Sequence, residues 1–150
     1  MSVQQIPLVV SWIAAIDPNR NTDEIGLAER MTRELSDASE LGITEYFIGY
    51  FEQLPTFFMV GSPVEGHNYE IVTLLVSPLI EEKLHLPLYH QVIQFVFKKE
   101  LVDRVIYQVE SKNELQKAIL AALGFRDFGS TDSAPIRVCY GCRRADFLVS

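Results

Sequence analysis

Midway through its second half the sequence reads Val102-Asp-Arg-Val-Ile-Tyr-Gln-Val-Glu-Ser-Lys-Asn113 and then, after a short amphipathic segment, Ala121-Ala-Leu-Gly-Phe125. β-Branched and aromatic residues dominate Asp103 to Val109, which predicts a strand. Ser111-Lys-Asn-Glu114 matches a capping box, which predicts the start of a helix. Gly124 suits the left-handed position just beyond a last helical turn. The segment therefore predicts a strand, a polar loop and a helix that ends at Gly-Phe.

The elements on either side extend this pattern. Upstream, Pro87 suits the first turn of a helix that runs to Glu100, and its many apolar positions predict that most of its circumference is buried. Downstream, Phe125 to Phe128 and Ile136 to Cys142 predict two more strands, joined by a polar loop around Ser130 to Ser133. The helix before Gly124 is expected to bury one face, formed by Leu115, Ala118, Ile119 and Ala122.

The first half begins with a β-rich run from Ile6 to Ile16, which predicts a strand stopped by Asp17-Pro-Asn19. Apolar residues then recur every three or four positions, which predicts a helix with Asn21 as its N-cap and its end before Gly42. Three further strands are predicted by the composition of the segments Thr44 to Phe51, Thr56 to Val60 and Tyr69 to Val76.

The order of these elements is strand, helix, three strands, helix, strand, helix and two strands. It predicts an α/β (α+β) fold with a mixed, mostly antiparallel central sheet and helices on both faces. A length of 150 residues suits one compact domain that buries roughly two-thirds of its unfolded surface. We therefore expect a single domain over residues 1–150.

The charge of the chain argues against nucleic-acid partners. There are 13 Lys and Arg against 20 Asp and Glu, and the net charge of −7 gives no overall basic field to neutralise phosphates. The first twenty residues lack a basic start, and their apolar run is shorter than the roughly 18 residues that cross a bilayer. We expect a cytoplasmic protein that binds neither nucleic acid nor membrane.

Cysteine and histidine give little evidence for a metal site. Cys139 and Cys142 form one C-x-x-C pair, whereas a structural zinc site would need a second pair. A redox pair is an alternative, but such motifs usually open a helix after a first strand. We interpret the two residues as reduced cysteines on a terminal strand and expect no metal.

Beyond these local patterns, the succession of strand, loop Asn113, helix and Leu-Gly-Phe125 resembles the second half of the GCN5-related N-acetyltransferase (GNAT) superfamily. A narrower resemblance, to the siderophore-biosynthesis acyltransferases that acylate N6-hydroxylysine, covers roughly the last two-thirds of the chain. It rests on four segments: Glu52-Gln-Leu-Pro-Thr-Phe-Phe58, Thr73-Leu-Leu-Val-Ser-Pro78, Arg104-Val-Ile106 and Val138-Cys-Tyr-Gly-Cys-Arg-Arg-Ala-Asp-Phe147.

The resemblance implies an acetyl-CoA or longer acyl-CoA donor. The backbone from Thr73 to Ser77 would pair with the pantetheine arm, and the start of the following helix would hold the pyrophosphate, where free N–H groups and the helix dipole favour an anion. Asn113 matches a family position that meets the cofactor, although it also suits the first turn of a helix. The cofactor-binding residues that the resemblance implies are Leu74, Leu75, Val76, Lys83, His85, Leu88, Tyr89 and Asn113.

The pyrophosphate segment departs most from the family pattern. Glu81 to Tyr89 contains no glycine, Pro87 removes one N–H donor, and two glutamates add charge of the wrong sign. Lys83 and His85 are candidate phosphate contacts, and both also suit a solvated loop.

For catalysis, the family motifs place a His at Thr73 and an Asp at Glu110. Of these two positions, only Glu110 keeps a carboxylate. Burial beside the cleft would raise the pKa of this carboxylate towards neutrality, so that it could act as a base. Thr73 cannot act as a base at pH 7 and would at most orient water or the amine. His67 and His90 are candidate substitutes for the missing His. Each of these residues also has an ordinary structural interpretation.

Three functions remain open from the sequence. The first is acylation of an amine, N6-hydroxylysine or a lysine-like side chain, with Glu110 assisting proton removal. The second is a GNAT-fold binding or interaction protein without catalysis, which the missing glycines favour. The third is acetylation of another small amine. On the acceptor side no motif is recognisable among Asp17, Asn19, Asp23 and Glu24.

Aromatic residues in the predicted meander have three possible roles: core, acyl pocket or a homodimer interface. We interpret them mainly as core because they recur at strand spacing. These residues are Tyr46, Phe47, Tyr50, Phe51, Phe57 and Phe58.

Overall fold

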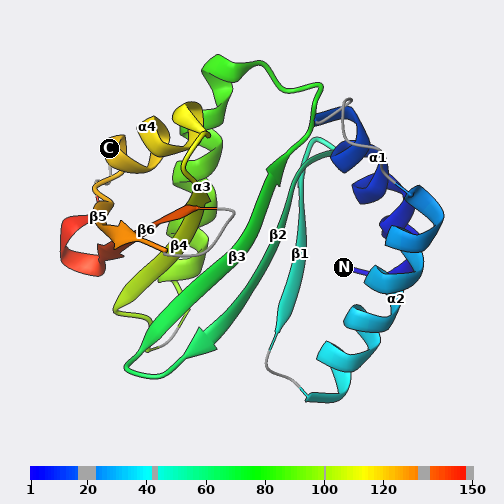
Figure 1. Cartoon of the computed structure of the whole chain (residues 1–150), viewed down its shortest axis with the longest axis horizontal. Coiled ribbons are helices and arrows are strands. Elements are labelled where there is room, and N and C mark those ends of the chain that lie inside the picture. The colour runs from blue at the N-terminus through cyan, green and yellow to red at the C-terminus, as the bar shows by residue number, and fades with distance from the viewer. Residues whose placement is uncertain (17–22, 42–43, 100, 132–135, 148–150) are drawn as a thin grey trace. The chain divides into compact units, whose positions relative to one another are not determined.

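A computed structural model describes residues 1–16, 23–41, 44–99, 101–131 and 136–147 of the chain (Figure 1). Three short 3-10 helices are labelled η. The elements, in chain order, are η1 (Val3–Gln5), α1 (Ile6–Ile16), α2 (Glu24–Leu41), β1 (Glu45–Phe51), β2 (Leu54–Val64), β3 (Asn68–Val76), η2 (Glu82–Leu84), α3 (His85–Phe97), β4 (Arg104–Glu110), α4 (Glu114–Ala122), β5 (Arg126–Ser130), β6 (Arg137–Arg143) and η3 (Arg144–Asp146).

The strands form one six-stranded sheet in the order β1-β2-β3-β4-β6-β5. The β1–β2, β4–β6 and β5–β6 ladders are antiparallel, and the β3–β4 ladder is parallel. The predicted α+β fold with a mixed, mostly antiparallel sheet is therefore confirmed. None of the helices in the described part of the chain is long and apolar enough to cross a membrane.

Residue contacts divide the chain into two compact units. Unit 1 comprises Met1–Gly61 and Thr73–Glu81, and unit 2 comprises Ser62–Val72 and Glu82–Ser150. The single-domain interpretation stays a prediction.

Unit 1 has a core in which α1 and α2 lie side by side (Figure 1). Residues of β1, β2 and β3, including Ile48 and Leu75, pack against that core. Its buried members are Ile6, Val9, Val10, Trp12, Met31 and Phe58. At about 25 cal/mol per Å² of apolar surface, each such side chain stabilises the fold by roughly 1.5–3 kcal/mol.

The predicted strand from Ile6 to Ile16 is wrong, because this run is helix α1. Ile6, Val9, Val10 and Ile13 meet the core, and their spacing is that of one helical face. The β-branched content of the run suggested a strand, whereas packing of this face decides the structure. Pro7 lies in the first turn, where its missing N–H costs little.

The start and end of helix α2 bear on two sequence predictions. The proposed N-cap Asn21 lies outside the described residues, and so do Asp17 and Asn19. Within the described residues, the Asp23 side chain accepts a hydrogen bond from the backbone N–H of Gly26 at 3.1 Å, three positions on, as an N-cap does. The helix runs to Leu41, so its predicted end before Gly42 is confirmed.

The hairpin of β1 and β2 turns through Glu52 and Gln53, whose φ values are +48° and +69°. Two successive positive φ values are typical of the type I′ turn that matches the twist of a hairpin. Next to the turn, Phe51 and Leu54 are a cross-strand pair and are exposed. Phe58 is core, as predicted, whereas Tyr50 and Phe51 are exposed.

In unit 2, α3 packs on β4 and α4. One face of α3 is buried, formed by Tyr89, Val92, Ile93, Val96 and Phe97. Of the apolar positions that predicted extensive burial, Leu88 is half-buried and only Phe95 is exposed; Leu86 is exposed as well. The two exposed apolar residues, Leu86 and Phe95, lie on the solvent side of the helix.

Both ends of α4 have identifiable caps. Asn113, not Ser111, is the N-cap, because its Oδ1 accepts from the backbone N–H of Gln116 at 3.1 Å. Gly124 is the residue beyond the last turn, as predicted, with φ +93°. A Cβ there would collide with the backbone carbonyl oxygen of Asp146. The position therefore requires glycine for two independent reasons.

Candidate functional site

The residues that the sequence predicted to bind acyl-CoA fall in both units. Thr73, Leu74, Leu75 and Val76 belong to unit 1, and the other predicted cofactor and catalytic residues belong to unit 2. The predicted site residues of unit 1 and those of unit 2 are therefore described separately.

In unit 1, the side chains at the end of β3, from Thr73 to Val76, are buried or half-buried. Leu75 packs against the unit 1 core, Leu74 and Val76 are buried, and Thr73 is half-buried. The buried Ser77 continues the strand, because its N–H donates to the carbonyl oxygen of Thr56 at 2.9 Å. Any role of Leu74, Leu75 and Val76 in cofactor binding would therefore use the backbone.

In unit 2, the segment predicted to hold pyrophosphate forms η2 and the start of α3. Leu84 is the N-cap of α3 and makes no side-chain capping hydrogen bond. Lys83 is exposed, while His85 and Leu88 are half-buried. A helix start of this kind favours an anion through its N–H groups and dipole.

Further along α3, the phenol of Tyr89 belongs to a buried polar network. The amide Nε2 of Gln116 donates to the hydroxyl oxygens of Tyr89 and Tyr107, both at 2.8 Å. Burial raises the pKa of Tyr89 to about 12, against the opposing effect of the hydrogen bond from Gln116. The Tyr89 phenol is thus held neutral, and one amide ties α3, β4 and α4 together.

Gln116 and Tyr107 were missed by the sequence prediction. Gln116 lies three positions after Asn113, and the Asn113 Nδ2 also donates to its Oε1 at 3.3 Å. A polar residue one turn before the buried pair Ile119 and Leu120 was the available signal. Asn113 therefore has a structural role as the N-cap of α4, in addition to the predicted role in cofactor binding.

Glu110 ends β4 and is exposed. The burial that we expected around its carboxylate is therefore not found. Its backbone is fixed, because its carbonyl oxygen accepts from the N–H of Asn113 at 3.0 Å and it lies opposite Arg137 in the ladder with β6. Glu110 therefore has a solvent-accessible carboxylate on a fixed backbone.

Neither candidate substitute for the missing histidine has a geometry that suggests catalysis. The Nδ1 of His67 lies 3.4 Å from the Oδ2 of Asp103, just before β4 begins, whereas Glu110 is at the far end of that strand. The ring of His90 stacks on Phe147 with centroids 5.0 Å apart. These contacts account for both residues structurally.

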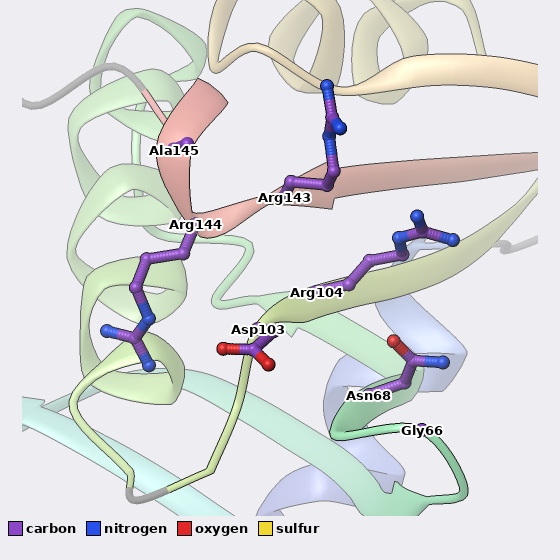
Figure 2. A pocket seen from close by; sticks show the side chains of 7 residues that line it. All are labelled: Gly66, Asn68, Asp103, Arg104, Arg143, Arg144 and Ala145. Carbon is purple, nitrogen blue, oxygen red and sulfur yellow. The ribbon is translucent and has the colours of Figure 1, made fainter.

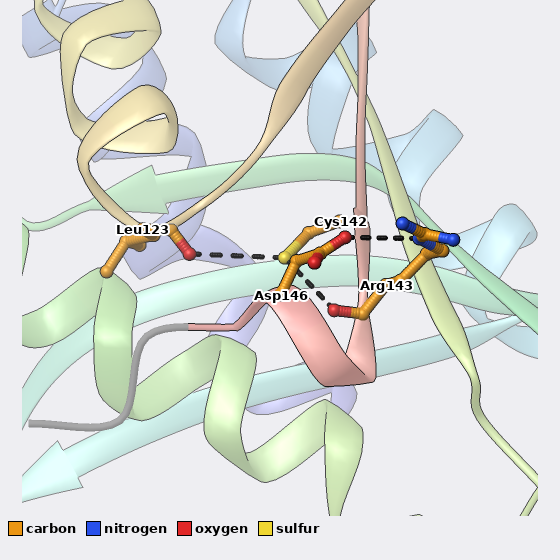
Figure 3. A network of polar contacts seen from close by, with 4 residues as sticks. All are labelled: Leu123, Cys142, Arg143 and Asp146. Atoms are coloured by element: carbon orange, nitrogen blue, oxygen red, sulfur yellow. Dashed lines mark hydrogen bonds and ion pairs between the residues drawn. The ribbon is translucent and has the colours of Figure 1, made fainter.

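The two cysteines are free thiols on β6, as expected. Because residues three apart in a strand point to opposite faces, Cys139 and Cys142 are not arranged as a redox pair. Figure 3 shows the Sγ of Cys142 donating to the carbonyl oxygens of Leu123 and Arg143, at 3.9 and 3.5 Å. Burial, with a smaller effect of Asp146, raises the pKa of Cys142 to about 11.

Among the residues that the structure describes, no three His, Cys, Asp or Glu side chains cluster as metal ligands.

A pocket of about 490 Å³ lies at the amino ends of β3 and β4, entirely within unit 2. Figure 2 shows Asn68, Arg104 and Arg143 on one side of the strands, with Asp103 and Arg144 on the other. Sequence reasoning missed this pocket, because it assembles residues from three separate segments. Its lining residues are Gly66, Asn68, Asp103, Arg104, Arg143, Arg144 and Ala145.

No protein-family model matches the chain, and no curated protein matches it significantly. Solved structures do match it over nearly the whole chain. An uncharacterized protein from Bacillus halodurans has a TM-score of 0.82 at 16% identity, covering 98% of this chain and 83% of that one. AAC(6′)-Ib in complex with ribostamycin and coenzyme A has a TM-score of 0.76 at 14% identity, covering 97% and 92%.

A third match is the N-acetyltransferase PseH from Campylobacter jejuni in complex with acetyl coenzyme A. Its TM-score is 0.74 at 15% identity, and the match covers 96% of this chain and 93% of that one. The chain therefore has the fold of the GNAT N-acetyltransferases.

Proposed function

We propose that the protein is an acyl-CoA-dependent N-acyltransferase. The observation that carries this proposal is the likeness in fold, over 96–98% of the chain, to structures that include an acetyltransferase in complex with acetyl coenzyme A. The sequence resemblance between Val102 and Phe125 supports the same activity independently.

In this proposal the donor is held mainly by backbone groups. Thr73–Val76 follows the last pair of the parallel β3–β4 ladder, Ile71 with Tyr107, and its buried or half-buried side chains leave the main chain to pair with pantetheine. The uncapped start of α3 holds the pyrophosphate, with Lys83 and His85 as its cationic and hydrogen-bonding neighbours. From the resemblance we also assign Leu88, Tyr89 and Asn113 to cofactor binding.

The reaction that we assign to this site is amide formation. The acceptor ammonium first gives up one proton to solvent, and the lone pair of the resulting neutral nitrogen forms a bond to the thioester carbonyl carbon as the carbon–sulfur bond breaks. Glu110, an exposed carboxylate at a fixed strand end, accepts the proton that the nitrogen loses, and the CoA thiolate takes up a proton. Thr73 orients the acceptor or a water through its hydroxyl.

The acceptor in this proposal is a cationic amine, N6-hydroxylysine or a lysine-like side chain. The net charge of −7 favours approach of a cation, and the narrower resemblance points to hydroxylysine. The structure of AAC(6′)-Ib in complex with ribostamycin and coenzyme A supports an amine acceptor for a protein of this fold. A cytoplasmic location fits this chemistry.

A turnover assay tests the proposal. Free thiol released from acetyl-CoA would be followed with hydroxylysine, lysine and ribostamycin as acceptors, using wild type and Glu110→Gln. We expect turnover with at least one amine and a loss of about 10²–10⁴-fold in kcat for the variant. Binding of acetyl-CoA without turnover of any amine would contradict the enzyme proposal.

A non-catalytic GNAT-fold binding protein is the second candidate. It is favoured by the glycine-free segment Glu81 to Tyr89 and by the exposure of Glu110. Charge substitutions separate the two candidates: if α3 holds pyrophosphate, Lys83→Gln weakens acetyl-CoA binding and Glu82→Gln strengthens it. Equal affinities in all three proteins would favour the binding protein.

A homodimer is also part of the proposal. The exposed Phe51 and Leu54 form a cross-strand pair at the tip of the β1–β2 hairpin and would suit an apolar contact. Light scattering on wild type and Phe51→Ser measures the mass directly. A monomeric mass for wild type at high concentration would contradict a dimer.

A further inference from the structure

Three polar residues form a row across three neighbouring strands of unit 2. In the strand registers, Asn68 on β3 pairs with Arg104 on β4, and Arg104 pairs with Arg143 on β6. Directly paired residues share one face of a sheet, with Cβ atoms about 4.5–5.5 Å apart in the antiparallel case. Figure 2 shows the three side chains projecting to the same side of their strands.

The row places two positive charges directly opposite each other in a protein of net charge −7. Such like-charge pairs destabilise a sheet when nothing lies between them. Arg143 has one acidic neighbour, since its Nε donates to the Oδ2 of Asp146 at 3.1 Å, which leaves its two terminal amino groups. Within the described residues, the half-buried Arg104 has only the ring of Phe128, 5.7 Å from its guanidinium carbon.

The one carboxylate that lines the pocket does not face this pair. Asp103 projects to the other side of β4 together with Arg144, and its Oδ2 lies 3.4 Å from His67 (Figure 2). Arg144 is anchored by a hydrogen bond to the carbonyl oxygen of Val102 and by the ring of Phe97. The side of the pocket that holds Asn68, Arg104 and Arg143 therefore carries two cations, and Asp146 offsets part of the charge of one of them, Arg143.

Backbone hydrogen bonds hold the segments of the pocket in place. The N–H of Asp103 donates to the carbonyl oxygen of His67 at 2.7 Å, and the N–H of Arg144 donates to that of Asp103 at 2.7 Å. These bonds fix the turn before β3, the start of β4 and the end of β6 relative to one another. A site fixed in this way needs little rearrangement to bind a ligand.

From this geometry we propose that the pocket binds the phosphate group of a small phosphorylated ligand, at a site separate from that of acyl-CoA. The Asn68 Nδ2 donates one N–H to the carbonyl oxygen of Glu65 at 3.0 Å, which leaves its second N–H. Together with the unused N–H groups of the two guanidinium groups, this gives more donors than the two oxygens of a carboxylate can use, whereas a phosphate has three or four oxygens to accept them. The separation rests on the proposed function, in which Glu110 lies at the acyl-CoA site: Arg104 and Glu110 are the two ends of β4, about 20 Å apart at 3.3 Å per residue.

Calorimetric titration with inorganic phosphate tests this proposal. Ionic strength is held constant with chloride, and no acyl-CoA is present. Wild type is compared with the variants Arg104→Gln and Arg143→Gln and with Arg137→Gln, which removes the same charge from the far end of β6. We expect saturable binding to wild type and Arg137→Gln, and at least tenfold weaker binding to the other two.

Equal affinities in all four proteins, or no binding to wild type, would overturn the proposal. A second titration in the presence of saturating acetyl-CoA identifies the source of the phosphate. Unchanged affinity supports a separate ligand, whereas displacement by acetyl-CoA would assign the pocket to the cofactor and overturn the claim of a separate site. Because the first titration contains no acyl-CoA, its outcome does not depend on the proposed acyltransferase activity.

Discussion

Arg104 on β4 lies directly opposite Arg143 on β6 in the antiparallel ladder. Their coupling is measurable with a double-mutant cycle in which each arginine is replaced by glutamine, followed by urea unfolding. Without added anion we expect a repulsive coupling below about 1 kcal/mol, because Arg143 is exposed. With phosphate the coupling becomes attractive. A coupling that keeps its sign and size in phosphate would contradict the proposed site.

Gln116 is predicted to stabilise unit 2 through its two phenol contacts. Removing its amide in Gln116→Ala leaves two buried hydroxyl groups without this partner and lowers the free energy of unfolding by about 1–3 kcal/mol. The exposed Gln91 on α3 gives a matched control, and Gln91→Ala is expected to change stability by less than about 0.5 kcal/mol. Similar effects of both substitutions in urea unfolding would refute a structural role for the network.

Two glycines allow backbone strain to be separated from steric collision. Gly129 has φ +114°, and no heavy atom lies within 4 Å of the position that a Cβ would occupy, so Gly129→Ala costs only the conformational penalty of about 1–3 kcal/mol. Gly124→Ala adds the collision with the Asp146 carbonyl oxygen and is expected to cost clearly more. Thermal unfolding of the two variants would contradict this account if Gly129→Ala were the less stable.

The predictability of the fold differs along the chain. From Thr44 to Cys142 the type and order of the elements followed from strand composition and helical periodicity. The structure of the run Ile6–Ile16 did not follow in this way, because a short apolar run rich in β-branched residues is compatible with a helix or a strand, and tertiary packing decides between them. At α4, Ser111 and Asn113 both suited a cap, and the backbone geometry of the loop selects Asn113. The buried residues there are Ile119 and Leu120, so the face predicted to include Leu115 and Ala118 is wrong.

The sites were less accessible from sequence than the fold. The Gln116 contacts join residues 27 and 9 positions apart, and the arginine pair depends on the register between strands far apart in the chain. Neither leaves a local pattern. By contrast, the succession from Val102 to Phe125 is local and was sufficient to indicate the GNAT fold.

The two cysteines are predicted to differ in reactivity. At pH 8 a thiol-specific alkylating reagent should modify Cys139, which is half-buried, and leave Cys142, whose raised pKa and burial keep it a protonated thiol. Mass spectrometry of the native protein should find one adduct, and that of the unfolded protein two. Two adducts under native conditions would show that Cys142 is accessible.

The same shift gives a pH dependence of stability. Because folding raises the pKa of Cys142 from 9.0 to about 11, its contribution to stability is complete below pH 9 and is lost as the pH rises through 11. Cys142→Ala should therefore lose less stability than wild type between pH 9 and 11. Parallel declines in urea unfolding across this window would show that the thiol is not the titrating group.

Acyl-CoA binding by this fold, despite its glycine-free pyrophosphate segment, is the property on which the proposed activity depends. Calorimetric titration of the wild-type protein with acetyl-CoA tests it most directly. We predict saturable binding with a Kd in the micromolar range. Absence of binding at millimolar acetyl-CoA would contradict the proposed function.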